Sequence, residues 1–117
     1  MIEELIARVF AARDIAHREH WKTRSYAQHM ALGDFHDAVI DQIDEIVECY
    51  QGEFGLVGDF QAGTVPVSNI STYLKGEMAW IQANCEVIAN GSDSVDNLID
   101  SLVATYQRAV YKLDNLI

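Results

Sequence analysis

The sequence predicts an all-α protein, an antiparallel four-helix bundle, on the strength of three observations. Apolar residues recur every three or four positions along four segments, and polar capping residues or glycines separate those segments. The chain of 117 residues contains one proline, Pro66. Two of the three joints are short, which favours antiparallel neighbours, and the longer second joint can cross over the bundle. A chain of this length is expected to form a single domain around one core.

The first two helices are separated by a short polar break. The first is expected over residues 2–21, and Thr23 or Ser25 then provides an N-cap for the next helix. The second helix is expected over residues 26–50. Gly52 is expected to end it, because a glycine just past a helix can adopt the left-handed closing turn.

A connector and two further helices complete the expected fold. The connector over residues 52–67 contains glycines and Pro66, but its apolar residues predict a packed loop rather than a free linker. The third helix is expected over residues 69–89, where Asn90 and Gly91 stop it. A serine cap then begins a fourth helix over residues 94–116.

Composition excludes several classes of function. The net charge is −10 and the eight basic residues are scattered, which argues against direct nucleic-acid binding. No apolar run approaches the roughly 20 residues that cross a bilayer, and no signal peptide is expected, because the first residues lack a positively charged region. Cys49 and Cys85 are expected to be buried thiols in a reducing compartment. A cytoplasmic protein without a membrane partner is therefore predicted.

Histidines and acids concentrate in one part of the chain. All four histidines lie within twenty residues of one another, and acidic residues follow at helical spacing. Imidazole and carboxylate groups on neighbouring helices are ligands of iron, manganese or zinc. The residues concerned are His17, His20, His29, His36, Asp34, Asp37, Asp41, Asp44, Glu45 and Glu48.

The positions on a helical wheel sharpen this hypothesis and leave an alternative open. His29 lies at the border between the apolar stripe of the second helix and a band of acids that includes Asp44 and Glu48. Like charges in such a band repel unless a cation is present, which favours ligation by the three residues together. Each carboxylate taken singly also fits a solvated surface strip. His20 lies on the apolar stripe of the first helix, where a buried imidazole is either structural or a ligand.

One acid on the third helix is expected to face inward. Glu77 falls within an apolar stripe, where an unpaired carboxylate would be costly. It is expected either to pair with Arg13, which shares the inner face of the first helix, or to serve as a further ligand.

These residues resemble the Dps group of the ferritin-like superfamily. That group has a His-Trp pair like His20-Trp21, a second histidine like His29, and an Asp-Glu-x-x-Glu signature like the segment from Asp44 to Glu48. The separation of fifteen residues between His29 and Asp44 is the same. The His-Trp pair, Tyr26-Ala-Gln-His29 and Tyr50-Gln-Gly also resemble small uncharacterised relatives encoded by tailed phages, for which the location would be the host cytoplasm.

The resemblance implies a ferritin-like bundle that forms at least a dimer and has a ferroxidase site between two-fold-related subunits. His20 and His29 would come from one chain, and Asp44 and Glu48 from its neighbour. Iron would be the metal, although manganese and zinc accept the same ligands. The Dps group has an acid where this chain has Gly33, so Asp34 or Asp37 would have to replace it.

Two other interpretations remain open. A ferritin-like scaffold without catalytic activity would act as a structural or protein-binding module, and the apolar residues of the connector would then provide a partner surface. A bundle that uses no metal would employ its inner polar residues only for pairing and specificity.

Overall fold

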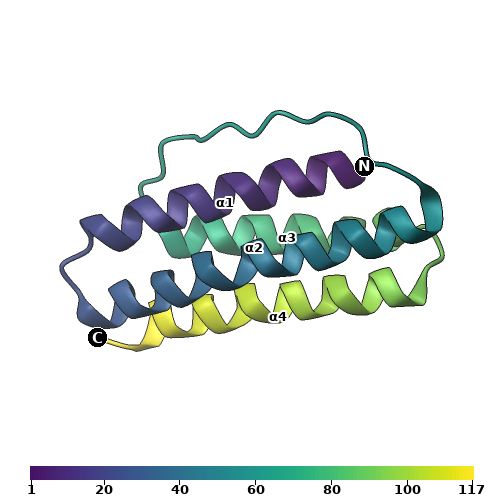
Figure 1. The fold of residues 1–117 in the computed structure, drawn as a ribbon. Helices are drawn as coiled ribbons and strands as arrows, with labels where there is room; N and C mark the ends of the chain where they lie inside the picture. The colour runs from purple at the N-terminus through teal and green to yellow at the C-terminus, as the bar shows by residue number, and fades with distance from the viewer.

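The computed structural model describes residues 1–117 and contains four helices and no strand. These are α1 (Ile2–Lys22), α2 (Tyr26–Phe54), α3 (Ile70–Ala89) and α4 (Asp93–Asn115). They pack as an elongated bundle of 44 × 24 × 21 Å (Figure 1). The predicted all-α four-helix bundle is confirmed. No helix is long and apolar enough to span a membrane.

The connectivity includes one long crossover. Helix α2 packs against α1 and α4, and α3 packs against α4 and, less extensively, α1. Figure 1 shows that each of these packed pairs is antiparallel, whereas α2 and α3 run in the same direction. The chain must therefore return along the full length of the bundle between α2 and α3. It does so outside α1.

Side-chain caps fix where three of the helices begin. The hydroxyl of Ser25 accepts a hydrogen bond from the Gln28 backbone N–H at 3.2 Å. Asn69 and Ser92 cap α3 and α4 in the same way. Each cap satisfies a backbone donor that the first turn leaves free, which is why these starts could be predicted closely.

The predicted end of α2 is wrong. The helix continues through Gly52 to Phe54, and Gly55 is the residue that takes a positive φ, 95°. Gly52 meets nothing nearby and stays helical, because a glycine permits the closing turn without requiring it.

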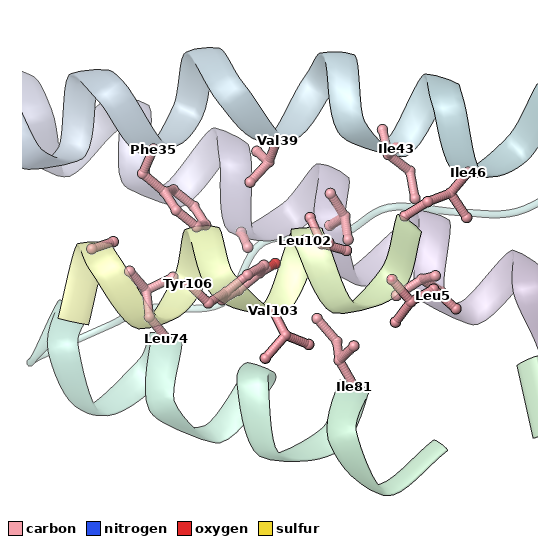
Figure 2. Packing of buried hydrophobic residues seen from close by; sticks show 14 of the residues in the cluster. Leu5, Phe35, Val39, Ile43, Ile46, Leu74, Ile81, Leu102, Val103 and Tyr106 are labelled. Carbon is pink, nitrogen blue, oxygen red and sulfur yellow. The ribbon is translucent and has the colours of Figure 1, made fainter. Parts of the chain in front are cut away.

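The core runs along the bundle axis and is closed by aromatic and branched side chains. Figure 2 shows Phe35, Val39, Ile43 and Ile46 of α2 directed toward α4, where Leu102 and Tyr106 lie. The ring of Tyr106 meets that of Phe35 edge-on, with centroids 4.8 Å apart. Tyr106 is fully buried and its hydroxyl has no hydrogen-bond partner. Burial, and after it the Glu77 carboxylate, raises the pKa of this phenol far above its usual range.

Glu77 pairs with Arg8, which corrects the expectation that Arg13 would be its partner. The Oε2 atom of Glu77 lies 2.6 Å from Nη1 of Arg8, and the Glu77 side chain is 14% exposed. The Arg8 guanidinium also lies 4.3 Å from the centre of the Trp80 ring. This ion pair links α1 to α3, where the two helices pack less extensively than the other neighbours.

We predict that Arg8→Met lowers the free energy of unfolding by about 1–3 kcal/mol, because it leaves a largely buried carboxylate without its partner. Glu4 also contacts Arg8, at 3.4 Å, but it is half-exposed. Glu4→Gln is therefore the matched control and is expected to change stability by less than about 0.5 kcal/mol. Urea unfolding followed by circular dichroism measures both variants. Equal losses of stability in the two variants would contradict the larger contribution expected from the Arg8–Glu77 pair.

The connector, residues 55–69, packs less than predicted. Its first half is held by the Gly58 N–H, which donates to Glu3 Oε2 at 2.9 Å, and by Phe60, whose ring meets Phe10 edge-on at 5.3 Å. Residues 61–66 are exposed and border hollows along α1. Cys49 and Cys85 are free and only partly buried, so the prediction that they would be buried is also wrong.

Candidate functional site

All four histidines meet between α1 and α2, next to the turn that joins these helices. The ring of His20 stacks on that of His29, with centroids 3.8 Å apart and planes 15° from parallel. The ring of His17 stacks in the same way on His36, at 3.9 Å and 14°. An edge contact of 5.4 Å between His20 and His36 joins the two pairs. All four side chains are partly buried. We call this group the histidine cluster.

The His20 and His29 rings are each anchored by the backbone of the other residue. Nδ1 of His20 lies 2.6 Å from the carbonyl oxygen of His29, and Nδ1 of His29 lies 2.9 Å from that of His20. Because a carbonyl oxygen only accepts hydrogen bonds, both Nδ1 atoms must carry a proton. In the neutral rings each Nε2 therefore keeps its lone pair. Imidazoles that bind metals are commonly oriented by this type of hydrogen bond from the other nitrogen.

Gly33 makes room for the His20 ring. A Cβ atom at this position would lie 3.0 Å from Cε1 of His20 and 3.2 Å from its Nδ1. Those separations are tighter than ordinary Cβ contacts, so a side chain here would require the imidazole to shift by a few tenths of an ångström. The space that a side chain at position 33 would occupy is thus taken by a histidine ring from α1.

We predict that Gly33→Ala stabilises the protein less than Gly76→Ala does. Gly76 is an exposed glycine within α3 that has no atom near its would-be Cβ, so alanine there should raise the free energy of unfolding by about 0.5–1 kcal/mol. The same gain in helix propensity at Gly33 is expected to be cancelled by displacement of His20. Urea unfolding, together with histidine ring signals in NMR spectra, compares the two variants. Equal gains and an unmoved His20 ring would contradict this reading.

The second stacked pair continues to the surface. Trp21, which is 68% exposed, lies against His17 with centroids 4.3 Å apart. The Nδ1 atom of His36 is buried and has no hydrogen-bond partner. Burial is the main cause that lowers the pKa of His36, and the neighbouring His17 adds to it, while Asp37 acts in the opposite direction.

The predicted acidic ligands do not join the histidines within one chain. Asp37, Asp44 and Glu48 are exposed on α2. Asp44 and Glu48 follow His29 by fifteen and nineteen positions, which is about 22 and 28 Å of helix at roughly 1.5 Å per residue. Asp37 is nearer, since it influences the pKa of His36. Within the chain, no group of three or more His, Cys, Asp or Glu side chains is arranged to hold a metal ion.

Arg13 was expected on the inner face of α1, but its place beside the histidine cluster without an acid partner was not. Its side chain is partly buried, its Nε atom has no hydrogen-bond partner, and it forms no ion pair. Its charge contributes to the lowered pKa of His36. The available signal was its place one helical turn before His17, on the side of α1 that carries the histidines.

Comparison with known proteins gives one family. The model of a family of unknown function, DUF5856, matches residues 20–113 and so includes His20, His29 and the acids of α2. No curated protein and no solved structure matches the chain.

Proposed function

The chain belongs to the DUF5856 family, and we propose that it is a ferritin/Dps-like protein that binds and oxidises ferrous iron at a site shared by two copies. His20 and His29 of one copy would bind the metal, and Asp44 and Glu48 of the other would complete the site. Asp37 would stand beside the shared site on the same face of α2.

The orientation of His20 and His29 is the observation that carries this proposal. Both rings donate from Nδ1 to a backbone carbonyl, so both retain an Nε2 lone pair that can bind a metal. Two imidazoles without carboxylates would suit zinc or copper as well as iron. Added carboxylates shift the preference toward iron and manganese, because harder oxygen ligands suit these ions.

The need for a second copy comes from the distances along α2. The rings are stacked face to face, and the nearest suitable carboxylates of the signature are more than 20 Å away along the same helix (about 22 Å for Asp44). A two-fold axis that pairs α2 with its copy in the antiparallel direction, midway between positions 36 and 37, brings position 29 of one copy opposite position 44 of the other. A site built in this way occurs twice in the dimer.

Two further features support this class of protein. A bundle with a single long crossover connection has the connectivity of ferritin-like folds. The exposed carboxylates of α2 also give a negative surface that attracts cations toward the shared site.

The proposed reaction is the oxidation of bound ferrous iron by dissolved oxygen. For every two ferrous ions oxidised, one dissolved oxygen molecule takes up two electrons from the iron and two protons from solvent and leaves as hydrogen peroxide. Anionic oxygen ligands stabilise the ferric product over the ferrous ion. The histidines hold the ion without adding charge, and the Asp44 and Glu48 carboxylates supply the negative charge. No nucleophile or general base is required.

Aerobic addition of ferrous iron to metal-free protein tests the proposal. Ferric absorbance is expected to rise clearly faster than in buffer, and the gain should be lost in Asp44→Ala/Glu48→Ala. Glu53→Ala and Asp59→Ala, which remove exposed acids elsewhere, serve as matched controls for charge and should keep the wild-type rate. A wild-type rate equal to that of buffer would reject the oxidase proposal.

A second candidate function is a protein-binding scaffold. Trp21, Tyr26 and Met30 surround the turn between α1 and α2 and are 68%, 76% and 45% exposed. Leu56 in the connector is 88% exposed. Large apolar side chains gathered beside one turn are typical of an interaction surface. This reading gains support if the wild-type protein neither oxidises iron nor binds it.

A further inference from the structure

The guanidinium of Arg13 borders a hollow and has no partner in the chain. The hollow has a volume of about 250 Å³ and lies between α1, α2 and the connector. Arg13 forms no ion pair, and its buried Nε atom has no hydrogen-bond partner. No hydrogen bond involves the terminal nitrogens, Nη1 and Nη2, and neither of them is enclosed as Nε is. The end of the guanidinium is therefore open to a ligand in the hollow.

The acids near this hollow leave the guanidinium free. Asp14 borders the hollow, but it is paired with Arg18 at 2.9 Å. Asp37 and Asp41 of α2 are exposed, and neither forms an ion pair with Arg13. A guanidinium that is partly removed from water attracts an anion more strongly than an exposed one, because the local dielectric constant is lower.

The rest of the hollow is mostly apolar. Its other lining residues are Phe10 and Ala11 of α1, Ile40 of α2, and Ala62 and Thr64 of the connector. Sites for drug-sized ligands have about 300–1,000 Å³, so a hollow of this size suits a smaller molecule. A single free cation among apolar walls favours a ligand with one negative group on a compact apolar body.

We propose that this hollow binds a small organic anion, a carboxylate on a compact apolar body, and that Arg13 recognises its charge. The carboxylate accepts hydrogen bonds end-on from Nη1 and Nη2, since Nε is buried. The apolar body lies against Phe10 and Ile40, and the Thr64 hydroxyl is at the outer edge beside the connector. None of the histidines lines the hollow, so this inference does not depend on the proposed function.

Titration of the full-length protein with benzoate tests the site by ¹H–¹⁵N NMR, in which the Nε–H of an arginine gives its own signal. Saturable shifts are expected for Arg13 Nε–H and for the backbone amides of Ala62 and Thr64. Benzamide has the same shape without the charge, and it should bind about tenfold or more weakly because the charge-assisted hydrogen bonds are lost. Acetate keeps the carboxylate but lacks the ring, and it should also bind more weakly than benzoate.

Replacement of the arginine tests its role directly. Arg13→Gln should weaken benzoate binding about tenfold or more, since it removes the only free cation that lines the hollow. Arg24→Gln is the matched control, because Arg24 is also an arginine without an ion pair but is exposed and lies away from the hollow. Its replacement should leave the affinity for benzoate unchanged.

A second pair of variants leaves the helices intact. Thr64→Glu adds a carboxylate at the edge of the hollow, where it competes with benzoate for Arg13 and should weaken binding about tenfold or more. Thr64→Gln matches it in size without the charge and should bind benzoate more tightly than Thr64→Glu does. Thr64 is exposed, so both variants should fold, which circular dichroism checks.

Three results would overturn the inference. These are the absence of saturable shifts at Arg13, benzamide binding as tight as that of benzoate, and an unchanged benzoate affinity in both Arg13→Gln and Thr64→Glu. If Arg13→Gln does not fold, the comparison of Thr64→Glu with Thr64→Gln decides. The expected result is weaker binding in the charged variant of that pair, and equal affinity in the two would overturn the inference.

Discussion

Replacing Tyr106 by alanine is expected to lower the free energy of unfolding by about 3–5 kcal/mol, the cost of removing a large ring from a packed core. Tyr106 has no exposed surface and packs edge-on against Phe35. It lies on α4, toward which the apolar face of α2 is directed (Figure 2). The surrounding helices cannot collapse into the space without losing other contacts. Urea unfolding followed by circular dichroism measures the loss.

Tyr106→Phe is the matched control and should not lower the free energy of unfolding. It keeps the ring and removes a hydroxyl that is buried without a partner. Removal of such a group is expected to leave stability unchanged or to raise it by about 1 kcal/mol. A loss of more than about 1 kcal/mol in this variant would show that the hydroxyl makes a stabilising hydrogen bond after all.

The double substitution His20→Gln/His29→Gln is expected to weaken metal binding about 100-fold or more, because it removes both nitrogens whose lone pairs are left free. Titration with Co²⁺, a spectroscopic substitute for ferrous iron, measures the affinity by visible absorbance. The wild-type spectrum should report nitrogen and oxygen ligation.

His17→Gln provides the comparison. His17 belongs to the same cluster and stacks on His36, but neither of its ring nitrogens is fixed by a backbone carbonyl. Its replacement is expected to change the affinity by less than about tenfold, below the roughly 10–100-fold cost of removing a group that hydrogen-bonds a metal ligand. An equal loss of Co²⁺ affinity in both variants would mean that all the histidines of the cluster contribute to metal binding. An unchanged affinity in the double variant would show that His20 and His29 are not ligands.

The fold could be predicted because its signals are local. The apolar stripes, the caps at Ser25, Asn69 and Ser92, and the Asn90-Gly91 stop each act over one or two helical turns. The end of α2 cannot be located from the sequence, because Gly52 and Gly55 are both suited to a closing turn and only the path of the connector decides between them.

Only part of the histidine cluster could be predicted from the sequence. Spacing alone indicated that His20 and His29 face the same interface, but their mutual carbonyl hydrogen bonds depend on how the turn sets α1 against α2. The role of Gly33 is visible only once the His20 ring is placed. From the sequence, Arg13 was the only expected partner of Glu77. The choice of Arg8 for Glu77 follows from the packing of α1 on α3, which no local pattern encodes.

Two copies are proposed to share each site, and complementation of metal binding between two variant chains tests this sharing. One chain carries His20→Gln/His29→Gln, and the other carries Asp44→Ala/Glu48→Ala, so that each alone should bind no Co²⁺ at the site. After the two are unfolded and refolded together, half of the dimers should be mixed, and each mixed dimer contains one intact site of two. Binding at about a quarter of the wild-type stoichiometry is therefore expected. A mixture that binds no more than its separate components would contradict a site shared between copies.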